Sequence, residues 1–238
     1  RIWIMLILNG KYGYLSNRIF TFANVIAFAK EHNLTVIYPG FEDYADEFPY
    51  FRNGNNTYPV GRSMMTCFQG RFHNWTMRLF EKFNYKRIIK IGYSDCFYFD
   101  DEKNSEIVNK MKSDALYYLD GLYFIDRVNL QKYAEDLREI FAAPVETRTA
   151  IGNNFDILRK SFDIIVGVHI RQGDYKQFMN GIYYYETDEY TAIMEHVENQ
   201  FRGKRVHFVI TSNKRQNQGS FRGLASSSFS GDFIEDLY

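Results

Sequence analysis

The first forty residues have the hydrophobic pattern of a strand, a helix and a second strand. Residues 2–8 are continuously apolar, as expected of a strand that is buried in a parallel sheet. After a loop with two glycines, apolar side chains recur at helical spacing over residues 19–33, and Ser16 is placed to cap this helix. Residues 34–38 form a second apolar run, which a Pro-Gly pair ends. This order predicts a parallel α/β fold with a right-handed crossover.

The rest of the chain returns to this alternation after a less regular middle. Residues 41–62 include a polar Asn-Gly-Asn-Asn-Thr stretch, which is typical of an irregular surface segment. The hydrophobic pattern predicts helices over 64–84, 129–142 (capped by Asn129), 146–160 and 187–201, and strands over 87–92, 115–119, 164–168 and 206–211. We therefore expect two strand-helix-strand halves, joined near residues 144–163.

The charge balance of the chain argues against a general affinity for polyanions. There are 29 Lys plus Arg and 29 Asp plus Glu, so the formal net charge is zero. No overall basic field would attract nucleic acid or an anionic membrane, although a local basic pocket is compatible with this balance. The hydrophobic content of 45% and the charged content of 24% are those of an ordinary soluble globular protein.

The cysteines and the chain ends indicate no special cellular environment. Cys67 and Cys96 have neither a CxxC motif nor a histidine at ligand spacing, so no zinc site or disulfide framework is predicted. The apolar run at residues 2–8 is too short to cross a bilayer, and no signal-peptide cleavage site follows it. We expect a cytoplasmic protein, either free or peripheral to a membrane. Because the chain starts at Arg1 and ends at Tyr238 in a helix-like pattern, we also expect both ends to be truncated.

Three ionisable residues follow the apolar run 164–168. They are His169, Arg171 and Asp174, and they come where a parallel sheet presents its ligand-binding edge, beyond the carboxyl ends of the strands. The planar fork of an arginine suits two phosphate oxygens, and Gly173 lets the backbone turn closely beside it. An equally weighted alternative is that Arg171 and Asp174 pair with each other and only hold the loop together.

Three other segments offer ligand contacts, each with an alternative. Asn17 and Arg18 follow the first glycine loop at a helix start and could reach into the crevice, or Asn17 could help to cap the helix. Ser212 and Asn213 end the strand 206–211 and could contact ribose or phosphate, or cap a turn. The tyrosine run 183–185 could stack on a sugar or base, although a packed aromatic cluster is the favoured interpretation.

Some motifs resemble a known enzyme family. The segment 169–175, His-Ile-Arg-Gln-Gly-Asp-Tyr, resembles the HxRRGDY motif of the bacterial α-1,2-fucosyltransferases of glycosyltransferase family 11. A looser HxRRxD form of this motif is shared with α-1,6- and protein O-fucosyltransferases. Residues 13–20 resemble the opening GGLGNQMF element of the family, and residues 211–217 and 234–238 resemble its later SN/SD and EDL elements.

The resemblance implies a fold, a reaction and substrates. The fold would be GT-B-like, α/β with two Rossmann-type domains facing a cleft. Residues 1–145 would form the acceptor-side domain, and residues 146–238 an incomplete nucleotide-sugar-binding domain. The reaction would be an inverting transfer of fucose from GDP-fucose, without a metal ion or other cofactor. The acceptor would be a glycan or lipid-linked oligosaccharide, and nucleic acid would not be a partner.

The resemblance also suggests roles for the donor-binding residues. Arg171 would bind the β-phosphate and stabilise the charge that develops as GDP departs. His169 would contact the guanine or ribose side, and Asp236 would accept the two adjacent protons of guanine. Asn17 would face the donor sugar or the acceptor. Ser212 and Asn213 belong to the same predicted donor site.

The acceptor hydroxyl must lose a proton in an inverting transfer, and a carboxylate is the usual base. Asp174 is the hypothesis for this base, with Glu186 behind it.

Two departures from the family pattern affect donor specificity. Gln172, a predicted donor contact, stands where the motif has its second arginine, which removes a positive charge. Tyr14 and Ser16 replace two glycines of the opening element. These departures leave two alternatives: a glycosyltransferase that uses another nucleotide sugar, or a non-catalytic homologue that binds a sugar nucleotide or glycan. Because the chain stops before the last strand-end motif of the family, we expect the natural protein to continue beyond Tyr238.

Overall fold

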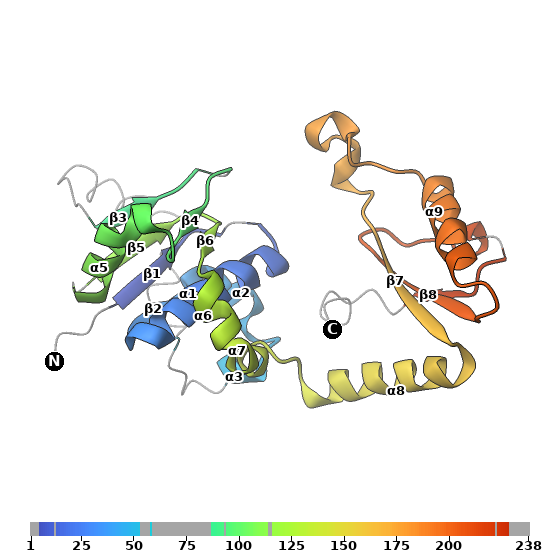
Figure 1. The fold of residues 1–238 in the computed structure, drawn as a ribbon, viewed down its shortest axis with the longest axis horizontal. Coiled ribbons are helices and arrows are strands. Elements are labelled where there is room, and N and C mark those ends of the chain that lie inside the picture. Colours follow the sequence, from blue (N-terminus) through green and yellow to red (C-terminus); the bar gives the residue numbers. More distant parts are fainter. Residues whose placement is uncertain are drawn as a thin grey trace. The chain divides into compact units, whose positions relative to one another are not determined.

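The computed structural model describes residues 5–11, 13–52, 58, 87–92, 94–113, 116–221 and 223–228. The predicted helix 64–84 with Cys67 lies outside these residues, and so does the segment 234–238 with Asp236. The chain divides into two compact units, Arg1–Ala142 and Ala143–Tyr238 (Figure 1). The roles predicted for the two halves, and their GT-B arrangement, stay predictions.

The first unit contains a four-stranded parallel sheet in the order β2-β1-β5-β3. Its strands are β1 (Met5–Asn9), β2 (Thr35–Ile37), β3 (Ile88–Lys90) and β5 (Leu116–Asp120). All four were predicted, because their short apolar runs bury side chains between the sheet and its helices. A second, two-stranded parallel sheet pairs β4 (Phe97–Tyr98) with β6 (Phe124–Ile125).

Helix α1 (Leu15–His32) connects β1 to β2, as predicted, but its start differs in detail. Tyr14 occupies the N-cap position without a side-chain hydrogen bond, and Ser16 lies exposed in the first turn. The predicted cap at Ser16 is therefore wrong. The helix ends as expected at Asn33, whose φ of 55° is left-handed and whose amide bonds back to the last turn.

The predicted helix 129–142 is two shorter helices, α6 (Arg127–Lys132) and α7 (Ala134–Ile140), which join at Tyr133. The capping residue is Asp126, whose side chain accepts a hydrogen bond from the backbone amide of Asn129, so the predicted cap at Asn129 is also wrong. A further helix, α5 (Ser105–Ser113), precedes β5.

Of the segment 41–62, which was predicted to be irregular, the structure describes residues 41–52 and Tyr58, and the polar stretch 53–57 lies outside the described residues. The described part is regular and packed. It contains a 3-10 turn (Pro39–Phe41) and two short helices, α2 (Glu42–Ala45) and α3 (Pro49–Arg52). Its phenylalanines are buried: Phe41 and Phe51 pack at a ring separation of 5.2 Å, and Phe51 stacks on Phe22 of α1 at 5.7 Å. Aromatic burial therefore organises residues 41–52, which the prediction had treated as irregular.

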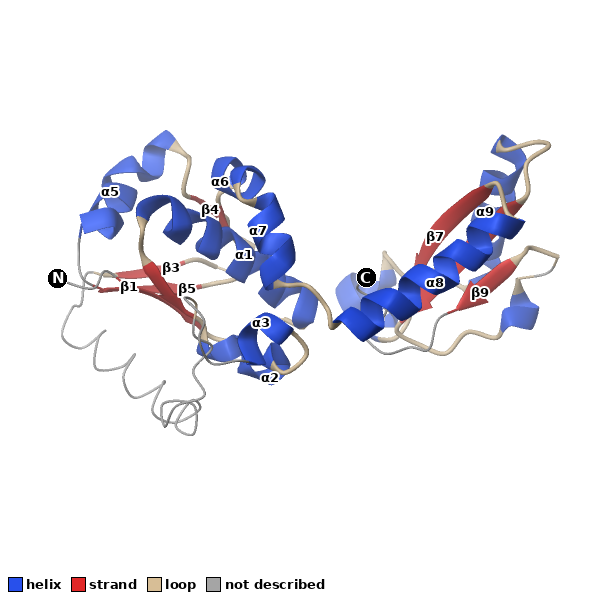
Figure 2. Ribbon diagram, turned by 90° about the horizontal axis from the view of Figure 1, so that it is seen from below, coloured by secondary structure: helices blue, strands red, loops and turns tan. Residues whose placement is uncertain are grey.

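The second unit is built on a parallel sheet in the order β7-β8-β9. Its strands are β7 (Ile164–Ile170), β8 (Val206–Ser212) and β9 (Ser226–Ser228), and its helices are α8 (Val145–Ser161) and α9 (Thr187–Gln200). Figure 2 shows both helices beside this sheet. Glu186 and Glu189 form a capping box at the start of α9. The strand β9 was not predicted, because three serines carry no hydrophobic pattern.

The strand β7 is less buried than predicted. It forms one edge of the described sheet, whereas β8 lies in the centre with Phe208 and Ile210 almost inaccessible. Val166 and Val168 pack against the core, but Gly167 and His169 on the other face are exposed. The two units are thus mixed α/β with parallel sheets, and the second presents His169 from the open face of an edge strand.

Candidate functional site

The loop after β7 holds the predicted phosphate-binding arginine in an ion pair. Arg171 Nε lies 3.1 Å from Oδ1 of Asp174, and Nη2 lies 2.9 Å from Oδ2. The guanidinium also lies 5.0 Å from the ring centre of Tyr175. Hydrogen bonds from Arg171 lower the pKa of Asp174, so this carboxylate stays ionised well into the acid range. Of the two alternatives for this pair, the structure contains the mutual ion pair, which fixes the direction of the arginine.

His169 joins the ends of the two longest strands of the second unit. It is paired in register with Thr211 of β8, and its Nδ1 lies 3.0 Å from the hydroxyl of Thr211. The imidazole is exposed. Its position beside the loop of Arg171 is compatible with the nucleotide contact that was predicted for it.

Gln172 is buried, unlike the second arginine of a phosphate site. Only 7% of the residue is exposed. Its Nε2 donates to the carbonyl of Tyr185 at 3.1 Å and lies 3.4 Å from the hydroxyl of Thr187. Its Oε1 accepts from Nε2 of Gln216 at 3.1 Å. The side chain therefore connects three segments, and its polar atoms bond to protein groups.

The loop after β8 is tied to the loop after β7. The backbone amide of Gln172 donates to Oδ1 of Asn213 at 3.0 Å. The hydroxyl of Ser212 accepts from the amide of Lys214 at 3.2 Å and from Gln216 at 3.0 Å. Ser212 thus acts as a turn cap, and Asn213 fixes the neighbouring loop. Gln216 was missed, because a glutamine in a polar loop has no sequence signal.

At Gly173 the loop after β7 approaches the side chain of Asn213 closely. A Cβ atom at this position would lie 2.4 Å from Nδ2 of Asn213, well inside any contact distance. The amide of Arg171 is also 3.4 Å from the hydroxyl of Tyr190 on α9, a residue that the sequence did not single out. The structure therefore brings His169, Arg171, Gln172, Asp174, Ser212 and Asn213 together at one end of the sheet.

In the first unit, Asn17 lies near the glycine loop, on the first turn of α1. A Cβ atom at Gly13 would collide with its amide at 2.2 Å, and Gly13 has a φ of 66°. The strand ends beside this loop carry Asn9 and Asp120, which are paired in register and about nine-tenths buried. Among the residues that the structure describes, the Nδ2 of Asn9 has no hydrogen-bond partner.

Arg18, which was expected to reach toward a ligand, instead points into its own unit. It is buried and donates to the carbonyls of Gly40 at 2.6 Å and Gly13 at 3.2 Å. It also pairs with Asp43 at 2.7 Å. Burial alone would raise the pKa of Asp43, but the hydrogen bonds from Lys11 and Arg18 outweigh it and lower that pKa. Arg18 thus holds the glycine loop in place, and its predicted access to the crevice is wrong.

The tyrosine run is divided between different contacts. Tyr183 stacks with Phe178 at 6.4 Å, and Phe178 stacks with Tyr175 at 5.3 Å. Tyr184 donates a hydrogen bond to Glu186, and Tyr185 meets Tyr190 edge-on at 6.0 Å. Phe178, Tyr183 and Tyr185 remain more than 40% exposed, so the favoured packed cluster is only partly realised.

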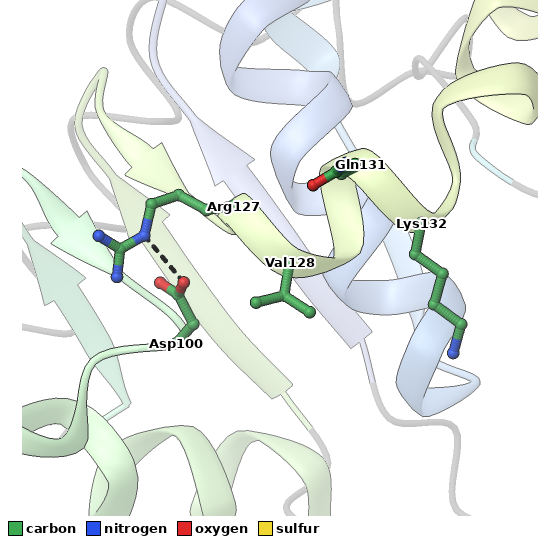
Figure 3. Close-up of a pocket in the computed structure, with 5 residues that line it drawn as sticks. All are labelled: Asp100, Arg127, Val128, Gln131 and Lys132. Carbon is green, nitrogen blue, oxygen red and sulfur yellow. Dashed lines mark hydrogen bonds and ion pairs between the residues drawn. The ribbon is translucent and has the colours of Figure 1, made fainter.

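Figure 3 shows an open pocket on the first unit, which includes none of the predicted site residues. It is lined by Asp100, Arg127, Val128, Gln131 and Lys132. Arg127 pairs with Asp100 at 2.9 Å, and Lys132 pairs with Glu31 at 2.5 Å. Because its cations already have carboxylate partners, we assign no ligand to this pocket.

The described residues include neither a metal-binding cluster nor a membrane-spanning helix. No group of three or more His, Cys, Asp or Glu side chains in them could hold a metal ion. No helix among them is both long and apolar enough to cross a membrane.

Comparison with solved structures identifies the fold of this chain. No protein-family model matches the chain, and no curated protein sequence does. The chain is similar to the solved structure of a mutant of the Arabidopsis thaliana fucosyltransferase FUT1 in complex with GDP, with a TM-score of 0.56 and 10% sequence identity. The match covers 99% of this chain and 61% of the plant structure. The chain therefore has a fucosyltransferase-like fold and spans about three-fifths of that structure.

Proposed function

We propose that this protein is a glycosyltransferase that transfers fucose from GDP-fucose to a hydroxyl of a glycan or lipid-linked oligosaccharide. The observation that carries the proposal is Arg171 at the carboxyl end of β7, oriented by Asp174 and flanked by His169. This is where parallel sheets bind ligands. The fucosyltransferase-like fold and the resemblance of segment 169–175 to the family motif point to the same donor.

The proposed chemistry is an inverting displacement without a metal ion. The acceptor oxygen forms a bond to the anomeric carbon, and the bond from that carbon to the β-phosphate oxygen breaks. The bonding electrons leave with GDP, whose growing negative charge Arg171 stabilises. A fixed guanidinium is effective in this role because it needs no reorganisation as the charge develops.

The other predicted site residues have either contact or support roles. His169 is exposed beside the arginine and is assigned to the ribose or guanine side of the donor. Asp236, assigned to guanine, and Asn17, assigned to the sugar or acceptor, keep their proposed roles. Gln172, Ser212 and Asn213 support the donor site by holding its two loops together.

Asp174 remains the proposed base that takes the acceptor proton. Asp174 is ionised, as a base must be, and the hydrogen bonds from Arg171 to both of its oxygens lower its pKa and so make it a weaker proton acceptor. Glu186 is the second choice, and it accepts a hydrogen bond from Tyr184. The half-buried ring of Tyr175 lies against Arg171, and the exposed rings of Phe178 and Tyr183 pack beside it. This aromatic cluster suits the apolar face of an acceptor sugar.

Calorimetric titration of the full chain with GDP, GDP-fucose, UDP and ADP, without added metal, tests the donor. We expect selective binding of the guanine nucleotides and a loss of at least about a hundredfold in turnover for Arg171→Ala. Arg202→Ala, an exposed arginine before β8, is the matched control. Equal binding of all four nucleotides, or no binding, would refute the proposal.

A second candidate function is binding of the sugar nucleotide without turnover. The buried glutamine at the position of a motif arginine favours it. Release of GDP from GDP-fucose, measured with glycan acceptors, separates the two candidates. Tight binding of GDP-fucose without any GDP release or transfer would support the binding protein.

A further inference from the structure

The loop after β7 lacks the charge that a diphosphate requires. Where the resembled motif has two arginines, this chain has Arg171 and the buried, neutral Gln172. The charge of Arg171 is balanced by Asp174. The next cation, Lys176, lies over the ring of Tyr184, 5.6 Å from its centre. A diphosphate with at least two negative charges would therefore meet little net positive charge from the residues 171–174.

Two cations stand on the neighbouring loop. Lys214 and Arg215 come directly after Ser212 and Asn213 at the end of β8, and Ser212 is paired in register with Ile170. The residues that follow Ser212 therefore run beside those that follow Ile170. Both side chains are exposed, and within the described part of the chain neither takes part in an ion pair or side-chain hydrogen bond.

Hydrogen bonds fix the backbone of Lys214 at both its amide and its carbonyl. The amide of Lys214 donates to the hydroxyl of Ser212 at 3.2 Å, and its carbonyl accepts from Nε2 of Gln216 at 3.1 Å. The same Nε2 bonds to Oε1 of Gln172. The glutamine that replaces a motif arginine is thus the residue that fastens the cationic loop to the loop of Arg171.

We infer that Lys214 and Arg215 supply the positive charge of the diphosphate subsite, in place of the second motif arginine. The inference rests on the proposed function, because it assigns a subsite of the same donor. The ligand class is the diphosphate of a nucleoside diphosphate or nucleotide sugar. A guanidinium binds two phosphate oxygens at once and an ammonium acts as a point charge, so the pair can hold both phosphates.

The test measures GDP affinity of the full chain by calorimetry at low and high salt. The variant Lys214→Ala/Arg215→Ala should bind GDP at least about tenfold more weakly than the wild type, the size of one lost charge-assisted contact. Its affinity should also depend less on salt, since fewer charge contacts remain to be screened. Lys214→Glu/Arg215→Glu should weaken binding further.

The matched control is Arg202→Ala/Lys204→Ala, which removes the same charge from the exposed turn before β8, at the other end of that strand. It should bind GDP like the wild type. Lys176→Ala removes a cation from the loop of Arg171 and leaves the loop after β8 unchanged. It should weaken GDP binding less than Lys214→Ala/Arg215→Ala does.

Three results separate the possible failures. If the wild type does not bind GDP, the proposed function fails and the subsite with it. If the wild type binds GDP and Arg171→Ala does not, but the Lys214/Arg215 variants bind normally and keep the wild-type salt dependence, only the subsite is refuted. If Arg202→Ala/Lys204→Ala weakens binding as much as Lys214→Ala/Arg215→Ala, the effect is one of overall charge and the subsite is again refuted. Thermal unfolding midpoints confirm that these surface variants remain folded.

Discussion

Arg171 and Asp174 are joined by two parallel hydrogen bonds, Nε to Oδ1 at 3.1 Å and Nη2 to Oδ2 at 2.9 Å. The carboxylate side chain is 57% exposed and the arginine side chain 33%. Ion pairs this exposed contribute little to folding, and their main effect is to select one geometry. We therefore interpret the pair as a device that orients the arginine at the end of β7, and its loss should affect function more than stability.

Replacement of Asp174 by Asn tests the proposed base. We expect turnover to fall by at least about a hundredfold, the scale of general-base catalysis, with the unfolding midpoint nearly unchanged. Steady-state kinetics and thermal unfolding measure the two effects. Asp163→Asn is the control, since Asp163 forms a similar two-point pair with Arg205 before β8. Near-normal turnover of Asp174→Asn would remove Asp174 from the reaction and leave Glu186 as the candidate.

A methyl group at Gly173 should separate the two loops of the site. Its Cβ would overlap with Nδ2 of Asn213, which would break the bond from the amide of Gln172 to that side chain. Gly173→Ala should lower the free energy of unfolding by about 1–3 kcal/mol and weaken GDP binding. Gly167→Ala, on the strand β7 that precedes this loop, is the control, because nothing in the described part of the chain lies within 4 Å of its Cβ. Equal effects of the two variants would contradict the close approach of the loops.

The hydrogen bond between Gln172 and Gln216 can be measured with a double-mutant cycle. Each single change to Ala leaves buried or half-buried polar partners unsatisfied, and should lower the free energy of unfolding by about 1–3 kcal/mol. The double variant should lose less than the sum, by about 0.5–3 kcal/mol, because the two residues are in contact. Denaturant unfolding supplies the values, with the exposed Gln177→Ala as control. Strict additivity would show that the two loops are not coupled through these side chains.

Arg18 should stabilise the first unit much more than its neighbour Lys11 does, although both pair with Asp43. Arg18 is buried and has two carbonyl partners besides the carboxylate, so Arg18→Met should lower the free energy of unfolding by about 2–4 kcal/mol. Lys11 is exposed, and Lys11→Met should change the free energy of unfolding by less than about 1 kcal/mol. Chemical denaturation gives the free energy of unfolding of both variants. Similar losses in the two would mean that the burial of Arg18 does not increase its contribution to stability.

His207 should make stability depend on pH in the weakly acidic range. The residue is buried on β8, and desolvation lowers its pKa below the ordinary value near 6.5. Below that value the unfolded chain takes up the proton more readily than the folded one. The full stability is therefore present above pH 6.5, and it falls as the pH drops toward the folded pKa.

Thermal unfolding between pH 8 and pH 5 measures this dependence. His207→Gln should flatten the decline below pH 6.5, whereas His196→Gln, at an exposed position of α9, should keep it. An identical pH profile for wild type and His207→Gln would show that the buried histidine does not cause the decline.

The elements whose signal is local were predictable from the sequence. Continuous apolar runs gave β1, β2, β5, β7 and β8, and helical spacing gave α1, α8 and α9. The grouping of His169, Arg171 and Asp174 at a strand end followed from the same pattern. Hydrophobic periodicity reports such elements because it depends only on neighbouring residues.

Only the tertiary structure decided which polar residues face outward and which hold the fold together. Gln172 and Arg18 both lie in segments that resemble a motif, but both are buried. Arg18 bonds to Gly40 and Asp43, and Gln172 bonds to Tyr185 and Gln216, so the partners of each are distant in the sequence. The same holds for the open face of β7, which depends on its place at the sheet edge, and for the buried phenylalanines of residues 41–51. Burial and hydrogen-bond satisfaction are set by contacts between distant segments, and no local pattern contains them.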